Sequence, residues 1–211
     1  MTENEEITLA LESAISGGSI SLLRGDIEIA HWIGTSNVSK AEDLLFNIDL
    51  LLTNNGIGRQ EINSIAVSAG PGSFTGIRIG IATALGLKAG LGIEMSSQSA
   101  LDAMAFSAAI HGPVTAALPV GRDAVCVQSF IVSADGIAPQ CEPYTVTEEA
   151  FIASVGGESS STFLVHGRFY EKVSAFPNAV NVGWNLANSV GRYCRTARGV
   201  VVPPLFISKS F

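Results

Sequence analysis

One glycine-rich segment holds the residues whose types and spacing come closest to a known chemistry. Residues 70–80 read Gly-Pro-Gly-Ser-Phe-Thr-Gly-Ile-Arg-Ile-Gly and stand between an apolar run and a helical pattern. A strand, a glycine turn and a helix N-terminus in this order can bind an anion through free backbone N–H groups. However, the spacing of Gly70, Gly72 and Gly76 misses the dinucleotide fingerprint by one residue, and no P-loop lysine is present. Ser73 lacks the GxSxG context of a nucleophile. The segment is therefore either an anion site or a tight strand-to-helix turn, and the turn is the simpler interpretation.

The other side chains with chemical potential are scattered along the chain. The histidines stand alone, without an HExxH motif or an acidic cluster at metal-ligand spacing: His31, His111 and His166. The cysteines form no CxxC pair: Cys126, Cys141 and Cys194. An odd, sparse set of cysteines is typical of a reducing compartment. We expect structural or surface histidines, no zinc site and a cytoplasmic location.

Composition narrows the classes of function. The 211 residues are 47% hydrophobic and only 15% charged, which excludes long disorder and suggests apolar surface covered by another subunit. The net charge of -7 disfavours a protein that grips nucleic-acid phosphates by itself. The acidic first six residues are unlike a signal peptide, and residues 103–121 are interrupted by Gly112-Pro113 and Pro119. We expect no membrane span.

The C-terminal region reverses the overall charge. No acidic residue follows Glu171, whereas five cations do: Lys172, Arg192, Arg195, Arg198 and Lys209. Two interpretations stay open, namely cations at a helix C-terminus followed by a solvated tail, or contact with an acidic partner or RNA.

The predicted elements occur twice in the same order: strand, hairpin, helix, strand, helix. In the first set, the strand is 7–11, the hairpin 19–23 with 27–32, the helix 39–53 with a capping box at 39–42, the next strand 62–68 and the next helix 74–89. A further helix begins at Ser99. The second comprises 114–118, 124–132 with 140–145, a helix capped by Thr147, 162–165 and 184–194. This order indicates an α/β fold of two tandem RNase H-like modules, as in actin, Hsp70 and sugar kinases. We place them at residues 1–110 and 111–211, with the second module shortened. A single irregular α/β domain is the alternative.

The helix at 74–89 has an unusual face of small residues. Gly72, Gly76, Gly80 and Ala84 recur every four residues. Each glycine within a helix costs about 1 kcal/mol relative to alanine, so another backbone must approach this face closely. The spacing leaves open whether that backbone belongs to this chain or to a second one.

The segment at 70–80 closely resembles the hallmark of the TsaB (YeaZ) family. The resemblance continues through residues 81–87 and 99–105, and more weakly in the closing segment 202–208. It implies a part in making threonylcarbamoyladenosine at position 37 of ANN-decoding tRNAs. It implies an actin-like (ASKHA) fold, and a non-catalytic assembly subunit that pairs through its first two helices with a TsaD-like catalytic subunit. A TsaE-like ATPase joins the complex, tRNA is met only through the complex, and a homodimer is possible in isolation.

Carried over to this chain, the resemblance implies a partner interface and no catalytic, metal or cofactor residues, because ATP and metal belong to the partner subunits. The implied interface residues are Leu45, Ile48, Gly72, Ser73, Phe74, Thr75, Gly76, Arg78, Gly80 and Ala84.

Two departures from the family pattern bear on catalysis. Leu11-Glu12-Ser13 stands where the first strand usually ends in Ile-Asp-Thr, and Pro119-Val120-Gly121 stands where Asp-Ala-Arg often opens the second module. An ATPase or phosphotransferase of the actin-like superfamily is the alternative function, and it would use Glu12 with a second carboxylate for magnesium. A peptidase has neither a metal motif nor a nucleophile–base pair to support it. We expect no ATP hydrolysis by the isolated chain.

Overall fold

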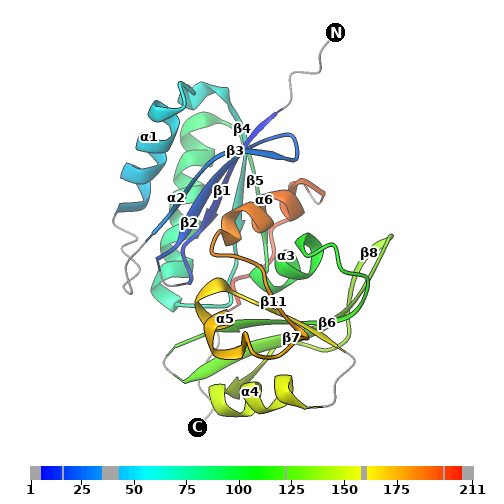
Figure 1. Cartoon of the computed structure of the whole chain (residues 1–211). Coiled ribbons are helices and arrows are strands. Elements are labelled where there is room, and N and C mark those ends of the chain that lie inside the picture. The colour runs from blue at the N-terminus through cyan, green and yellow to red at the C-terminus, as the bar shows by residue number, and fades with distance from the viewer. Residues whose placement is uncertain are drawn as a thin grey trace.

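The computed structural model describes residues 6–15, 17–34, 43–121, 123–157, 161–196 and 198–205 (Figure 1). The capping box at 39–42, Lys209 and the end of the closing segment lie outside these residues. The elements of the first half are β1 (Ile7–Glu12), β2 (Ser19–Arg24), β3 (Ile27–Ile33), α1 (Leu44–Asn54), the 3-10 helix η2 (Arg59–Glu61), β4 (Ile62–Ser68), α2 (Phe74–Leu91), β5 (Glu94–Gln98) and α3 (Ala100–Ser107). Those of the second half are β6 (Gly112–Pro119), β7 (Ala124–Ser133), β8 (Gly136–Pro139), β9 (Tyr144–Thr147), α4 (Glu148–Gly156), β10 (Thr162–Val165), α5 (Gly167–Val173), β11 (Ala179–Asn181) and α6 (Leu186–Thr196).

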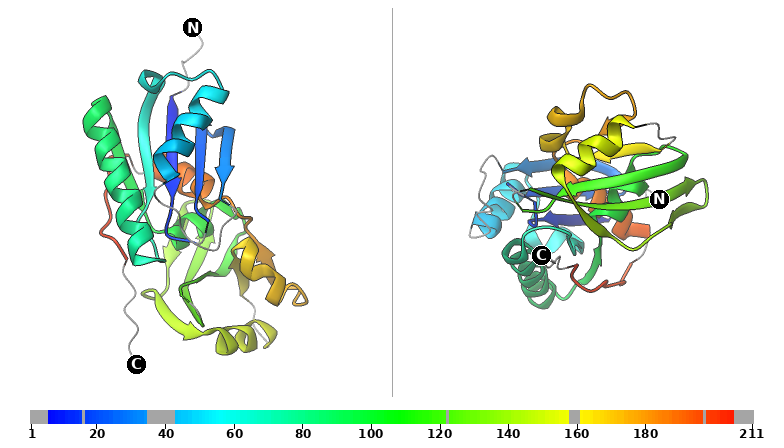
Figure 2. Two further views of the ribbon diagram at one scale, coloured as in Figure 1. Left: turned by 90° about the vertical axis from the view of Figure 1, so that its left-hand side faces the viewer. Right: turned by 90° about the horizontal axis from the view of Figure 1, so that it is seen from below.

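The first sheet has the strand order β3-β2-β1-β4-β5, with β1–β2 and β2–β3 antiparallel and β1–β4 and β4–β5 parallel. Its central strand β1 is buried at every position, as expected for a strand covered on both faces. Helices α1 and α2 lie on one face and α6 on the other (Figure 2). The predicted strand–hairpin–helix–strand–helix order is therefore present here.

The second sheet repeats this arrangement in the order β11-β10-β6-β7-β8, with β9 also pairing with β7. Its outer strands are short, since β10 has four residues and β11 three. The predicted hairpin turn at residues 134–136 is present, and Tyr144 and Thr145 pair with β7 as expected. The bounds of the partner strand at 140–145 were wrong, because the strand that directly follows the turn is β8 and β9 begins only at Tyr144. The elements η2, β5, α5 and β11 were not predicted at all. The α/β fold class of two RNase H-like modules is confirmed.

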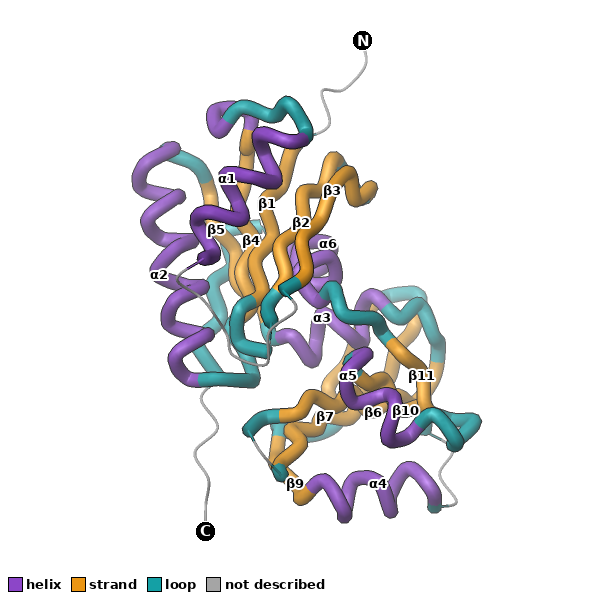
Figure 3. The backbone as a smooth tube through the Cα atoms, turned by 60° about the vertical axis from the view of Figure 1, so that its left-hand side comes forward, coloured by secondary structure: helices purple, strands orange, loops and turns teal. Residues whose placement is uncertain are grey.

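Two helices lie between the sheets, and each packs on the sheet formed by the other half of the chain (Figure 3). Helix α3 packs against β6, β7 and β8, while α6 packs against β1, β2 and β4 and also against α3. The contact of α6 with the first sheet is close, because a Cβ on Gly191 would lie 2.8 Å from the Cβ of Ala10. The boundary near residue 110 stays a prediction, and the structure shows that packing on each sheet draws on residues from both sides of it.

Candidate partner-binding surface

The glycine turn before α2 is attached to the end of β1. The Gly70–Pro71 peptide bond is cis, and Gly70 has a φ of 94° that favours glycine. The Ser73 backbone N–H donates to the Ala14 carbonyl at 2.7 Å, and the Ser73 hydroxyl caps α2 by accepting from Gly76 N–H at 3.3 Å. Of the two sequence interpretations, the structure therefore displays a tight strand-to-helix turn with a capped helix.

The small-residue face of α2 packs inside this chain. A Cβ added to Gly76 would clash with the Ser13 carbonyl and would lie 3.1 Å from the Ala14 Cα. A Cβ on Gly80 would meet the Ser13 hydroxyl, which itself donates to the Gly76 carbonyl at 2.9 Å. The backbone that approaches these glycines is thus the residue 13–14 loop after β1, so the alternatives left open by the spacing are resolved toward internal packing.

This packing divides the sequence-predicted interface residues into two groups. Four are buried: Gly76, Gly80 and Ala84 on the small-residue face of α2, and Ile48, which lies at the wall of a pocket described below. Five are exposed, namely Leu45, Ser73, Phe74, Thr75 and Arg78, and Gly72 is half-buried. The Arg78 guanidinium lies 5.2 Å from the centre of the Phe74 ring, which helps to hold both side chains on the outer face of α2.

Exposed apolar side chains gather on helices α1 and α2. Of eleven exposed large hydrophobic residues among those described, five belong to these two helices: Leu45, Phe46, Leu50, Phe74 and Leu85. We call these five residues the α1–α2 surface. Phe46, Leu50 and Leu85 were not among the predicted interface residues; for Phe46 and Leu50, their positions outside the buried stripe of α1 were the available signal. Concentrated apolar exposure of this kind is typical of a protein-binding surface.

A pocket of about 290 Å³ lies between the same helices. It is lined mainly by leucines and isoleucines from α1, β4 and the C-terminal half of α2: Leu45, Ile48, Leu52, Ile62, Leu87 and Leu91. An exposed ion pair between Arg59 and Asp49 forms part of its rim. The pocket has the size and lining to receive an apolar side chain from a partner.

Helix α2 is long and apolar. Within the described residues it is the one helix long and apolar enough to cross a membrane, judged by length and composition alone. Its glycine face packs on the loop after β1, however, so its exposed apolar residues occupy one side only. This pattern is that of a helix attached to a sheet.

Glu12 occupies the position at which an actin-like enzyme would need its first carboxylate. It is 2% exposed, and its Oε1 accepts the backbone N–H groups of Ala14 at 2.6 Å and Ile15 at 3.0 Å. Burial raises the pKa of Glu12 to about 7, and the two backbone hydrogen bonds oppose that rise. The side chain thereby holds the 13–15 loop on which α2 packs. No group of three or more His, Cys, Asp or Glu at metal-binding distance occurs within the described residues.

Two of the histidines and three of the C-terminal cations have local partners among the described residues. His31 lies 3.2 Å from Glu28, whereas His166 is buried against Trp184 and burial lowers its pKa. Three of the cations form ion pairs within the chain: Lys172 with Glu148, Arg195 with Asp26 and Arg198 with Glu6. Arg192 is exposed on α6.

Comparison with known proteins places the chain in a family. The model of the family described as TsaD, tRNA N6-adenosine threonylcarbamoyltransferase, matches residues 38–149, which is more than half of the chain. The chain belongs to this family. Its similar relatives include the tRNA threonylcarbamoyladenosine biosynthesis protein TsaB of Haemophilus influenzae, 37% identical over 101 residues, and that of Bacillus subtilis, 33% identical over 97 residues. These matches cover 47% and 46% of this chain and 42% of each relative, so the chain aligns with less than half of their length.

A solved structure matches the fold of this chain over most of its length. A Pseudomonas aeruginosa protein described as similar to peptidase YeaZ matches with a TM-score of 0.67 and 20% identity, over 95% of this chain and 100% of that one. At this identity the match shows the fold alone, and it confirms the fold class. Together with the TsaB relatives, it confirms the resemblance to TsaB and YeaZ that residues 70–80 indicated.

Proposed function

We propose that this chain is a non-catalytic assembly subunit in tRNA threonylcarbamoyladenosine biosynthesis. Its partners would be a TsaD-like catalytic subunit and a TsaE-like ATPase, in the cytoplasm, with tRNA met only through the complex. The single observation that carries the proposal is the α1–α2 surface. Five large apolar side chains of α1 and α2 are exposed, whereas the small-residue face of α2 is packed inside the chain.

The environment of Glu12 supports the non-catalytic part of the proposal. An actin-like phosphotransferase would need this carboxylate to face its substrate or metal. Here Oε1 accepts two backbone N–H groups in a buried loop. Ile15 belongs to the same apolar cluster as Val120 and Leu186 from the second module, so apolar packing surrounds the chain segment that follows Glu12.

Size-exclusion chromatography with light scattering tests the proposal on purified proteins. The wild-type chain is expected to co-elute with the TsaD homologue of the same organism. The variant Phe46→Ser/Leu85→Ser is expected to lose co-elution while keeping its melting temperature, because both residues are at least half exposed. The matched control is Ile131→Ser, an exposed apolar residue of β7 that should leave association intact. Unchanged co-elution of the double variant would contradict the proposed surface.

A further inference from the structure

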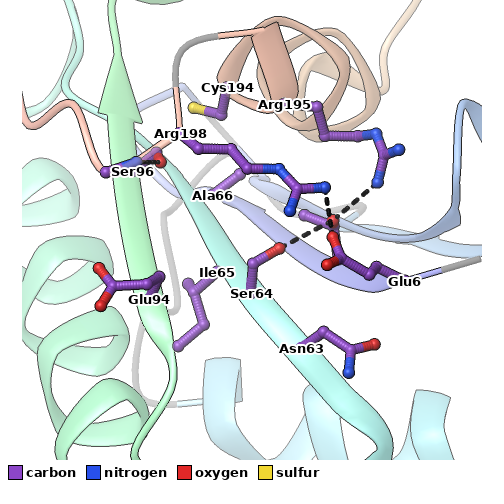
Figure 4. A pocket seen from close by; sticks show the side chains of 12 residues that line it. Glu6, Asn63, Ser64, Ile65, Ala66, Glu94, Ser96, Cys194, Arg195 and Arg198 are labelled. Carbon is purple, nitrogen blue, oxygen red and sulfur yellow. Dashed lines mark hydrogen bonds and ion pairs between the residues drawn. The ribbon is translucent and has the colours of Figure 1, made fainter.

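A second pocket lies on the opposite face of the first sheet, where α6 ends before the strands do. It has a volume of about 190 Å³ and is lined by residues of β1, β4 and β5, by the last turn of α6 and by the chain that follows it (Figure 4). Strand alternation places Thr8 on the same face as Ala10, which packs under α6. Since α6 stops at Thr196, the neighbouring positions of that face stay uncovered.

The floor of this pocket is formed by hydroxyl groups. Thr8 and Ser64 lie 3.0 Å apart through their side-chain oxygens, and the Ser96 hydroxyl accepts the Gly199 N–H at 2.8 Å. A hydroxyl that accepts one hydrogen bond still has a proton to donate, and in a hydrogen-bonded pair only one proton is used. Ser96 and the Thr8–Ser64 pair can therefore each donate to a ligand.

Two guanidinium groups complete the pocket. Arg195 is mostly buried, with a side chain 19% exposed, and bonds Asp26 at 3.3 Å and Thr8 at 3.5 Å. Arg198 reaches across the pocket to the Glu6 carboxylate, as Figure 4 shows. A guanidinium has five N–H donors, so with respect to the described residues both arginines keep donors that these contacts do not use. Arginine forks of this kind match the geometry of carboxylates and phosphates.

The acidic residues nearby are arranged to leave an oxyanion position. The Glu94 carboxylate points away from the guanidinium groups in Figure 4, and Asp26 is 81% exposed. Glu6 is itself an oxyanion held by Arg198, and the two side chains are 42% and 55% exposed. An ion pair this exposed contributes little stability, so a competing oxyanion can replace the Glu6 carboxylate at low cost. The three acids around the pocket also disfavour a continuous polyanion such as RNA.

We propose that this pocket binds a small oxyanion, a phosphate monoester or a carboxylate, in the place that Glu6 occupies between Arg198 and the hydroxyl floor. The site is independent of the α1–α2 surface, because it lies on the other face of the sheet. Glu6 acts as an internal competitor, so its removal strengthens binding and removal of Arg198 weakens it.

Nuclear magnetic resonance titration at low ionic strength tests this site, with inorganic phosphate in one arm and acetate in the other. Saturable shifts at the arginine side chains are expected with at least one of the two probes, and the stronger probe identifies the ligand class. Arg198→Gln should weaken binding about tenfold or more, as expected for loss of a charge-assisted hydrogen bond. Glu6→Gln should tighten it.

Matched charge changes outside the pocket serve as controls. Arg192→Gln on the exposed side of α6 and Glu149→Gln in the first turn of α4 should leave the affinity unchanged. Circular dichroism establishes that each variant is folded. The proposal is overturned if no probe saturates, if Arg198→Gln binds as wild type, or if the two control variants shift the affinity as much as the pocket variants do.

Discussion

The internal packing of α2 predicts that the same substitution changes the stability of the chain differently at two glycines of this helix. Gly76→Ala places a methyl group against the Ser13 carbonyl and 3.1 Å from the Ala14 Cα, where backbone has to move. Gly86→Ala places it in open space, since no described residue lies within 4 Å. Both changes gain up to about 1 kcal/mol of helix propensity. For Gly76→Ala, overpacking opposes this gain and lowers the free energy of unfolding by ~1–3 kcal/mol.

The difference between the two variants therefore isolates the packing cost. At about 2–4 °C per kcal/mol for a chain of this size, Gly76→Ala should melt at least ~2 °C below Gly86→Ala. Thermal unfolding of the isolated chain, followed by circular dichroism, measures both, with wild type expected below Gly86→Ala. Equal stability of the two variants would refute the internal packing of the small-residue face, and with it the reason for the exposure of the opposite face.

A second test of the same contact uses Gly80. A Cβ on Gly80 would meet the Ser13 hydroxyl rather than backbone, so removing that hydroxyl should relieve the clash. In a double-mutant cycle, Gly80→Ala and Ser13→Ala should be coupled, the pair losing less stability than the sum of the single variants. Additive losses would show that the two residues do not touch.

Three further predictions concern other parts of the chain. Burial raises the pKa of Glu12 to about 7, so its stabilising contribution is full below the unfolded pKa near 4.5 and is lost as pH rises through 7. In urea unfolding, Glu12→Gln should therefore become more stable relative to wild type as pH rises across that window. A stability difference that does not change with pH would refute the raised pKa. Gly167→Ala should destabilise the second module, because its Cβ would lie 2.5 Å from Trp184 Nε1. In denaturant unfolding, the stability lost by Gly167→Ala should be much smaller when Trp184 is replaced by alanine. A loss of the same size in both backgrounds would contradict the contact. The isolated chain should release no phosphate from magnesium–ATP over hours, whereas a turnover abolished by Glu12→Ala would favour an actin-like ATPase.

Much of the fold could be predicted from the sequence because local patterns and tertiary structure agree there. Strand β4 and the start of α2 occur where the apolar run and the glycine turn indicated them. Strand β5 could not be predicted because it reads Glu-Met-Ser-Ser-Gln, and its buried polar residues are satisfied by long-range contacts. The Ser97 hydroxyl donates to the Val202 carbonyl, and Ser97 pairs with Val201. No local pattern contains that information.

The candidate surface shows the same division between local and long-range information. The four-residue spacing of small residues in α2 correctly indicated a close backbone approach, but it could not identify the backbone. That backbone is the residue 13–14 loop, more than sixty positions earlier in the chain, and its position depends on the buried Glu12 carboxylate. The predicted interface therefore includes Gly76 and Gly80, which are buried inside the chain, and does not include the exposed Phe46 and Leu85; the interface itself stays a prediction.

The central claim is that this chain supports tRNA modification by assembly rather than by supplying a catalytic group. The most direct measurement is threonylcarbamoyladenosine formation on tRNA, reconstituted from the organism's own TsaD and TsaE homologues with each variant of this chain at equal concentration. We expect loss of product without the chain and with Phe46→Ser/Leu85→Ser, and normal product with Glu12→Gln. Full association of Glu12→Gln with its partners together with loss of product would contradict it, because the carboxylate would then take part in the chemistry.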